Sequence, residues 1–200
     1  MAWNQHLFLL INASAHPNAV LLLVARLIAG SPVYAGPALL AGLWIWGPAA
    51  RRGALLSVAL AMLIGLGINQ VLGALWFEPR PFMIGLGHKL IAHPADNSFP
   101  SDHATFVWSL GLGLIITTAA RRWGLAVCVY GLFVAWARVF LGVHFPIDMM
   151  APVPVAIVAA GCARAMVGPI DRLVLPVLDA VYETLLRILH LPPGLFPRRS

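Results

Sequence analysis

The chain has 200 residues, of which 60% are hydrophobic and only 10% are charged, and its formal net charge is +6 at pH 7. Soluble domains carry charge on roughly a quarter of their residues, so this composition excludes an ordinary soluble domain and predicts a single-domain integral membrane protein. The arginines occur in short pairs between apolar runs and form no basic stripe, so the positive charge does not indicate nucleic-acid binding.

The N-terminal segment MAWNQHLFLLINASAH lacks the basic region of a secretory signal, and residues 5–13 are too short to span a bilayer. We expect them to lie at the membrane interface. Six later runs have the length and apolar character of spans, which requires roughly 20 residues each. They are residues 17–30, 33–50, 53–77, 103–120, 123–142 and 147–167. The sequence therefore predicts an all-α, six-transmembrane helix bundle as the domain of residues 1–167.

The arginines predict the orientation of these spans. One pair falls between the second and third runs, another between the fourth and fifth, and two more lie around the end of the sixth. These residues are Arg51, Arg52, Arg121, Arg122, Arg164 and Arg172. Alternating spans put all three places on one side, which the positive-inside rule makes cytoplasmic. Both termini are then expected in the cytoplasm, and the loops near 31–32, 78–102 and 143–146 are expected to face outward.

The segment 168–200 is predicted to be a cytoplasmic amphipathic tail. Apolar residues recur at helical spacing between Asp171 and His190, and charged residues occupy the other side, with Pro176 expected to kink or delay the helix. Glu183 and Arg187 form a favourable pair four residues apart. We interpret this segment as a helix on the inner membrane surface, the alternative being a helix that binds a partner.

Ionisable side chains collect in the loops that are predicted to face outward. The first group lies in WFEPRPFM, where Arg80 stands between Pro79 and Pro81 after the third run. Arginine is suited to bidentate contact with phosphate or carboxylate. An arginine here is also explained by a side chain that extends to the membrane surface, so this segment alone does not identify a site.

The second group lies in SFPSDHATF, at the start of the fourth run. Ser101 or Asp102 can cap the following helix, and the free amides at a helix N-terminus also bind anions. A cap explains Ser101 and Asp102. It does not explain His103, because an ionisable side chain at the membrane boundary is costly and usually functional.

The third group lies in ARVFLGVHFPIDM, where Arg138 ends the fifth run and His144 follows six residues later. Pro146 is suited to the first position of a helix, so that His144 and Asp148 share a face. The carboxylate can then hold the imidazole in one tautomer, as in catalytic dyads and triads. A His–Asp pair standing alone would be structural, but the cations of the other two groups are predicted on the same side of the membrane.

Two histidines, two arginines, a serine and a helix N-terminus suit an oxyanion with several oxygens, and phosphate is the obvious candidate. Phosphoryl transfer requires positioning and charge stabilisation above all. One imidazole can attack phosphorus while the other protonates the departing oxygen. Because the cations already supply positive charge, we expect no metal and no other cofactor.

These segments resemble the signature of the type-2 phosphatidic acid phosphatase superfamily, a six-spanning and metal-independent family. The strings PRPF, FPSDH and GVHFPID are similar to its bacterial undecaprenyl-diphosphate phosphatase branch in particular. The likeness covers roughly residues 5–167. The residues that carry it are Arg80, Pro81, Pro100, Ser101, Asp102, His103, Arg138, His144 and Asp148.

The resemblance implies that His144 is the nucleophile and forms a phosphohistidine, with Asp148 orienting it. It implies that His103 protonates the leaving group and later helps to activate water. The residues expected to hold the phosphoryl oxygens are Arg80, Arg138 and Ser101.

The sequence departs from the family pattern at two positions. Members often have a lysine seven residues before the arginine of the first motif, where this chain has Gly73. Arg26 or Lys89 could supply that cation, although Arg26 is equally explained by a side chain that extends to the membrane surface. Many members have glycine in place of Asp102, which here either caps the helix or tempers the positive charge of the site.

The resemblance predicts a lipid phosphatase in the bacterial inner (cytoplasmic) membrane, with its site facing the periplasm or the outside. It would hydrolyse undecaprenyl diphosphate to undecaprenyl phosphate and recycle the carrier lipid for envelope synthesis. Alternatives are hydrolysis of, or phosphate transfer to, another lipid, such as phosphatidylglycerophosphate, phosphatidic acid or lipid A. A transporter is disfavoured because the ionisable groups lie at span ends on one side and not along a path through the membrane.

Overall fold

The computed structural model describes residues 2–190, which form α-helices and two short 3-10 helices and contain no β-strand. The prediction of an all-α fold is therefore confirmed for this part of the chain. The α-helices are α1 (Ala2–Ile11), α2 (Ala19–Gly30), α3 (Pro32–Trp46), α4 (Arg52–Leu75), α5 (Asp102–Ile116), α6 (Arg121–Phe140), α7 (Pro146–Met150), α8 (Pro152–Leu173) and α9 (Leu175–Ile188).

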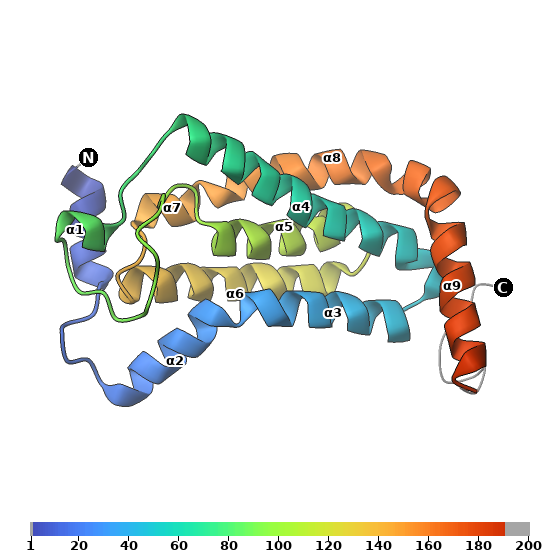
Figure 1. The fold of residues 1–200 in the computed structure, drawn as a ribbon, viewed down its shortest axis with the longest axis horizontal. Helices are drawn as coiled ribbons and strands as arrows, with labels where there is room; N and C mark the ends of the chain where they lie inside the picture. The colour runs from blue at the N-terminus through green and yellow to red at the C-terminus, as the bar shows by residue number, and fades with distance from the viewer. Residues whose placement is uncertain (1, 191–200) are drawn as a thin grey trace.

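The long helices lie side by side along one axis, and α1 and α9 lie at opposite ends of this bundle (Figure 1). Helix α5 is in the middle and packs on α4, α6 and α8. Small residues let the backbones approach: a Cβ atom added to Gly124 on α6 would lie 2.7 Å from the carbonyl oxygen of Gly111 on α5. The core of the bundle is apolar, with Val58 and Leu114 fully buried at its centre.

The first two predicted spans form a single bent rod. Helices α2 and α3 meet at an angle of 55°, and the chain continues in the same general direction instead of turning back at residues 31–32. The bend has a local cause, because Pro32 has no N–H to donate while Ser31 still donates to the carbonyl of Leu27. Neither helix alone is long enough to span, since 12 and 15 residues rise only about 18 and 22 Å.

The count of six spans is consequently not confirmed. Three helices are long and apolar enough to cross a bilayer, and there are four such elements if the bent pair counts as one span. These are residues 49–75, 121–140 and 146–173, with the α2–α3 pair. Helix α5 is apolar but has only 15 residues. Because α2 and α3 run in one direction, the first and last described helices lie at opposite ends, whereas the sequence predicted both termini on one side.

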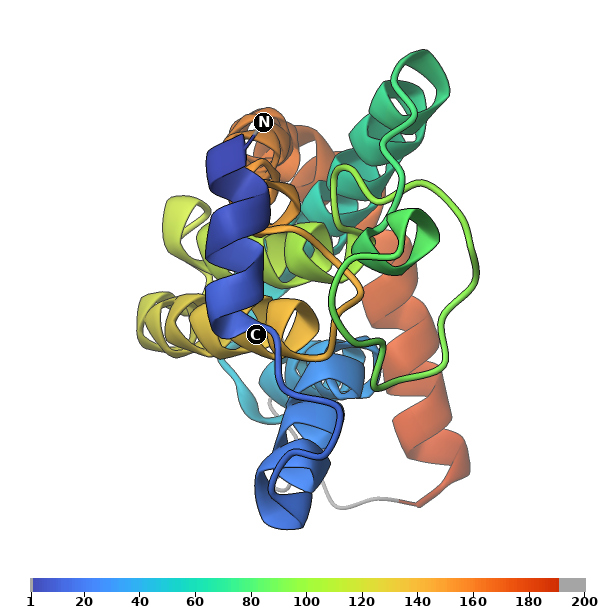
Figure 2. The ribbon, with the colours of Figure 1, turned by 90° about the vertical axis from the view of Figure 1, so that its left-hand side faces the viewer.

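The long connection between α4 and α5, residues 76–101, folds over one end of the bundle beside α1 and the α6–α7 connection (Figure 2). It contains the 3-10 helix η2 (Pro81–Ile84). The backbone N–H of Leu90 donates to the carbonyl of Leu141, at 3.0 Å, and Asn12 bonds both His88 and Phe140. Gly142, with φ of +78°, is required here because a Cβ would collide with the His88 carbonyl. The loop is thus fixed against the turn that carries His144.

Helix α9 crosses the opposite end of the bundle, and the Glu183–Arg187 pair is confirmed at 3.3 Å. Asp179, expected on the charged outer side, is instead buried, and its carboxylate lies 2.9 Å from Arg52. The guanidinium of Arg52 also stacks over the ring of Tyr182 at 4.3 Å. Helical spacing alone did not reveal that a buried arginine would meet α9. The division of the chain at residue 167 stays a prediction, and α8 runs on to Leu173.

Candidate active site

Three chain segments bring the candidate residues together at the loop-covered end of the bundle. Arg80 follows α4 and precedes η2, Ser101 precedes the first turn of α5, and His144 lies in the short turn between α6 and α7. Arg138 reaches the same place from the last turn of α6. Each of these four side chains is at most 5% exposed, so polar residues that are far apart in the sequence are buried at one end of the bundle.

The His144 ring lies between two arginines. Its Nε2 atom is 2.9 Å from Nη1 of Arg80 and 3.4 Å from Nη2 of Arg138. A guanidinium only donates hydrogen bonds, so Nε2 faces donors and presents its lone pair to them. A neutral ring that carries its proton on Nδ1, the side that faces Ser98 and Asp148, leaves Nε2 as the atom able to attack an electrophile.

The Nδ1 side of the ring faces Ser98 and Asp148. The Oγ atom of Ser98 is 3.2 Å from Nδ1 of His144 and donates a 2.5 Å hydrogen bond to Oδ2 of Asp148. The direct separation between His144 Nδ1 and Asp148 Oδ2 is 3.5 Å. Oδ2 also accepts the backbone N–H of Phe145 at 2.8 Å, the bond expected of an acidic residue in the first turn of a helix. The carboxylate thus acts on the imidazole chiefly through the serine hydroxyl.

His144 is held in its neutral form. Burial lowers its pKa well below the usual value, and the charges of Arg138, Arg80, His93 and His103 lower it further, in that order. His103 lies in the first turn of α5, and the backbone N–H of Ser101 at that helix start donates to the carbonyl of Asp148 at 3.1 Å, so both histidines predicted for the site lie at the same end of the bundle. Burial likewise lowers the pKa of His93, with Arg80 as the next cause. A neutral imidazole among cations is a competent nucleophile at neutral pH.

Arg80 is fixed by three further acceptors. Its Nε donates to Oδ1 of Asp96 at 2.7 Å, Nη2 to the carbonyl of Asn97 at 2.9 Å, and Nη1 to the carbonyl of Val143 at 2.9 Å. One hydrogen of Nη2 has no acceptor among residues 2–190 and remains for another ligand. The guanidinium is therefore preorganised, which reduces the free-energy cost of orienting it around an anion.

Two buried donors of the site have no protein partner. Nε of Arg138 and Oγ of Ser101 are buried and form no hydrogen bond within residues 2–190. Nη2 of Arg138 lies 2.9 Å from Nε2 of His93. Buried polar groups are nearly always satisfied, so unpaired donors near His144 and at the start of α5 fit an oxyanion with several oxygens. No group of three His, Cys, Asp or Glu side chains in the described part of the chain is arranged to hold a metal ion.

Comparison with known proteins places this architecture in a family. The model of the PAP2 superfamily matches residues 54–170, which is more than half of the chain and includes every predicted site residue except Arg26. The chain belongs to the PAP2 superfamily. The resemblance predicted from the motifs is thereby confirmed.

Two curated PAP2 relatives match most of this chain. "Putative undecaprenyl-diphosphatase YbjG" of Escherichia coli (strain K12) is 34% identical over 165 residues, which cover 82% of this chain and 81% of the relative. Undecaprenyl-diphosphatase BcrC of Bacillus subtilis (strain 168) is 32% identical over 155 residues, 78% of this chain and 79% of the relative. The fold matches the crystal structure of Aquifex aeolicus LpxE with a TM-score of 0.63 at 23% identity, over 82% of this chain and 95% of LpxE.

The remaining predicted residues of this PAP2 site lie at varying distance from His144. His103 is partly buried on the first turn of α5. The Asp102 carboxylate forms no cap, and it accepts hydrogen bonds from Asn69 at 2.9 Å and Gln70 at 3.5 Å. Arg26 is exposed on α2 and donates to the carbonyl of Leu90. The structure therefore does not join Arg26 to the group around His144.

The position of the absent lysine is occupied by a neighbour. A Cβ atom added at Gly73 would lie 2.8 Å from Nδ2 of Asn97, and this amide donates to the carbonyl of Phe99. Asn97 also accepts the backbone N–H of Glu78 at 2.7 Å. The Asn97 side chain thus fills the space beside Gly73 and links the two ends of the α4–α5 connection by hydrogen bonds. Lys89 does not replace the lysine there, because its ammonium donates to the carbonyl of His93.

Sequence reasoning missed three residues of the candidate site. Ser98 contacts both His144 and Asp148, Asp96 holds Arg80, and His93 bonds Arg138. His93 and Asp96 were noticed only as members of an ionisable loop. The position of Ser98 three residues before Ser101 was the available signal, since a short polar segment between two prolines must fold over the same helix N-terminus.

Proposed function

We propose that this PAP2 protein is a membrane phosphatase that hydrolyses undecaprenyl diphosphate to undecaprenyl phosphate and inorganic phosphate. The names of two relatives that are 34% and 32% identical over most of the chain support the substrate. The apolar helices support a lipid substrate reached from the bilayer. The product would return to cell-envelope synthesis as a carrier lipid.

The arrangement around His144 carries the proposal. Nε2 of His144 attacks the terminal phosphorus, the bond from phosphorus to the bridging oxygen breaks, and undecaprenyl phosphate departs. The N–H on Nδ1 is held by Ser98, whose own proton points to Asp148, so the imidazole that becomes positively charged is stabilised without leaving its place. Arg80 and Arg138 lie beside Nε2 and stabilise the equatorial oxygens of the transferring group.

His103 completes the reaction in this proposal. The negative charge of the bound diphosphate favours the protonated ring of His103 against burial and the nearby cations, and as an imidazolium it donates a proton to the bridging oxygen as that oxygen departs. As a neutral base it then removes a proton from the water that attacks phosphorus, which releases phosphate and restores the Nε2 lone pair of His144. Ser101 donates its unpaired hydroxyl to a phosphoryl oxygen. Asp102 acts indirectly, because Asn69 holds its carboxylate at the rim of the site. No metal or other cofactor takes part.

The topology we propose follows the bent α2–α3 pair. With that pair as one span, the arginines at 51–52 and 121–122 lie at one end of the bundle with α9, and the site lies at the other end (Figure 1). The positive-inside rule assigns the arginine-rich end to the cytoplasm of a bacterial inner membrane. The site and α1 then face the periplasm or the outside, and α9 lies on the cytoplasmic membrane surface. This changes the expected side of the N-terminus and retains that of the site.

Phosphate release from a panel of purified lipids tests the proposal. The panel contains undecaprenyl diphosphate, phosphatidylglycerophosphate, phosphatidic acid and lipid A, each in the same detergent. We expect the largest kcat/KM with undecaprenyl diphosphate and no release by the His144→Ala variant. Cleavage of another member while undecaprenyl diphosphate stays intact would refute the substrate, and full activity of the variant would refute the nucleophile. Acid quench during turnover is expected to trap ³²P on the wild-type protein only.

A further inference from the structure

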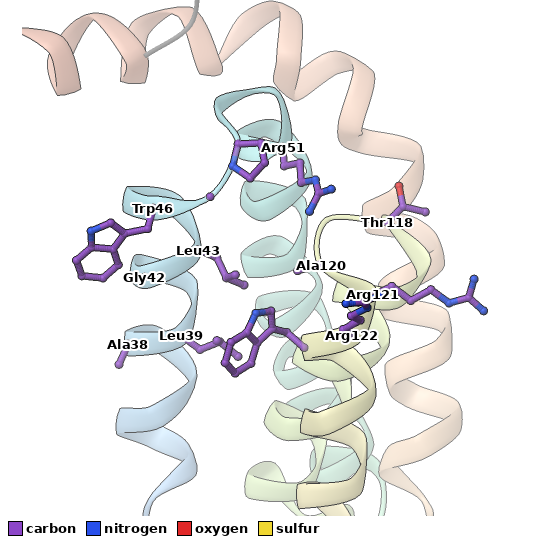
Figure 3. Close-up of a pocket in the computed structure, with 13 residues that line it drawn as sticks. Ala38, Leu39, Gly42, Leu43, Trp46, Arg51, Thr118, Ala120, Arg121 and Arg122 are labelled. Atoms are coloured by element: carbon purple, nitrogen blue, oxygen red, sulfur yellow. The ribbon is translucent and has the colours of Figure 1, made fainter. Parts of the chain in front are cut away.

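A cavity lies at the end of the bundle remote from His144, between α3 and the α5–α6 turn. Its volume is about 830 Å³, within the range of sites that bind small molecules. Figure 3 shows Leu39 and Leu43 on α3 along one side, Arg121 and Arg122 at the start of α6 on the other, and Arg51 at the end between them. None of these residues belongs to the catalytic group, so the cavity is a separate feature.

The cavity carries positive charge that the protein does not neutralise. Arg51, Arg121 and Arg122 are exposed and line it, and no carboxylate is among the residues around it. Across residues 2–190 no ion pair or side-chain hydrogen bond engages any of the three, in contrast to the buried neighbour Arg52, which meets Asp179. Guanidinium groups gathered on one cavity attract an anion, and phosphate oxygens match their planar donors.

The other wall of the cavity is apolar and small. Ala38, Leu39, Gly42 and Leu43 occupy successive turns of one face of α3 and form a strip that an alkyl chain can follow. Trp46 at the end of α3 and Trp123 beside Arg122 at the start of α6 also line the cavity, and they are 70% and 54% exposed. Exposed tryptophans on membrane proteins mark the level where the hydrocarbon meets the headgroups. The arginines therefore lie at headgroup level and the strip lies below it.

We propose that this cavity binds one anionic phospholipid of the surrounding bilayer. The phosphate of the lipid contacts Arg51 and Arg122, and Arg121, whose side chain extends away from α3 (Figure 3), adds positive charge nearby. One acyl chain lies along the α3 strip between Leu39 and Leu43. Basic pockets between membrane helices on the cytoplasmic side are suited to anionic headgroups, because the attraction between charges adds to the burial of the chain. A phosphodiester lipid without net charge lacks the net charge attraction, and free phosphate has no acyl chain to bury. The site is independent of the phosphatase reaction.

Lipid retention by the purified full-length protein tests the site. The protein is incubated in detergent with phosphatidylglycerol or phosphatidylcholine, and the bound lipid is counted by native mass spectrometry. We expect one retained phosphatidylglycerol, and about fivefold or greater loss of retention in a variant with Arg51→Gln, Arg121→Gln and Arg122→Gln. The matched control carries Arg164→Gln, Arg172→Gln and Arg187→Gln, which remove the same charge outside the cavity, and it is expected to retain the lipid.

A second variant removes the space and not the charge. Gly42→Leu adds a side chain whose Cβ would lie at an ordinary 3.7 Å from the Trp46 ring, so the helix accepts it while the cavity fills. It is expected to lose the lipid with the arginines intact. Circular dichroism and gel filtration establish that each variant is folded. Equal retention of the two lipids by the wild type, retention by the triple arginine variant or by Gly42→Leu, or displacement by millimolar sodium phosphate would each overturn the proposal.

Discussion

The hydroxyl of Ser98 lies between Nδ1 of His144 and Oδ2 of Asp148, at 3.2 and 2.5 Å respectively. Both ring and carboxylate are buried, and the direct separation between them is longer, at 3.5 Å. The serine therefore positions the ring that we propose as the nucleophile, and it does so from a loop that is remote in sequence from either partner. Its contribution can be measured apart from theirs.

Replacing Ser98 by alanine is expected to lower kcat about 10- to 100-fold and to leave KM within about threefold, because the ring loses its orientation and not its contact with substrate. Phosphate release from undecaprenyl diphosphate measures both constants. Ser109→Ala is the matched control, since Ser109 is also buried and its Oγ has no hydrogen-bond partner in the described part of the chain. A kcat of Ser98→Ala equal to that of the control would contradict the role.

Arg80→Lys is expected to reduce kcat/KM about 100-fold or more, because a single ammonium cannot reproduce donors that reach Asp96, Asn97, Val143 and His144 together. The same assay measures it. Arg164→Lys, an exposed arginine on α8, serves as the control and should change kcat/KM by less than about twofold. Comparable effects of the two variants would show that a positive charge suffices at position 80 without the oriented donors of the guanidinium.

The acid limb of the pH profile is expected to lie below pH 6.5. The reactive form of His144 is neutral, and burial and the surrounding cations lower its pKa, so protonation removes activity only as the pH falls through that lowered value. The measurement is log kcat/KM against pH for undecaprenyl diphosphate, with the ionisation of the substrate determined separately by ³¹P NMR. After that correction, a protein group titrating above pH 6.5 on the acid limb would contradict the assignment.

Activity is expected to persist in the presence of excess EDTA and to gain nothing from magnesium. In the proposed reaction Arg80 and Arg138, both buried beside His144, supply the positive charge that a metal ion would otherwise bring. Phosphate release after dialysis against chelator measures this. If activity disappeared and returned only with a divalent ion, the proposed role of the arginines would be wrong.

The buried pair of Arg52 and Asp179 is expected to hold α9 on the bundle. Asp179→Ala leaves the guanidinium of Arg52 buried without this carboxylate, so we expect Tm in detergent to fall by roughly 5–10 °C. Glu183→Ala removes the partner of the more exposed Arg187 and is expected to shift Tm by no more than about 2 °C. Differential scanning fluorimetry gives both values. Equal shifts would mean that α9 does not depend on the buried pair.

The sequence by itself determined the all-α class and the ionisable residues from which the candidate site is built. Apolar runs of span length and a scarcity of charge require buried helices, because an unpaired backbone is too costly in hydrocarbon. The few ionisable residues in the outward loops are then informative, since an ionisable side chain at the membrane boundary is costly and is usually functional. This is why Arg80, His103, Arg138, His144 and Asp148 could be named before any coordinates.

The tertiary structure decided what local pattern does not encode. Hydropathy counts apolar residues and ignores direction, so it could not show that α2 and α3 meet at only 55° and continue in the same general direction. The position of Ser98 depends on how the 76–101 connection folds back onto the α6–α7 turn, which is set by backbone hydrogen bonds such as Leu90 to Leu141. Asp179 is buried because Arg52, the first residue of α4, pairs with its carboxylate. Each of these contacts joins residues distant in the chain, and only packing brings them together.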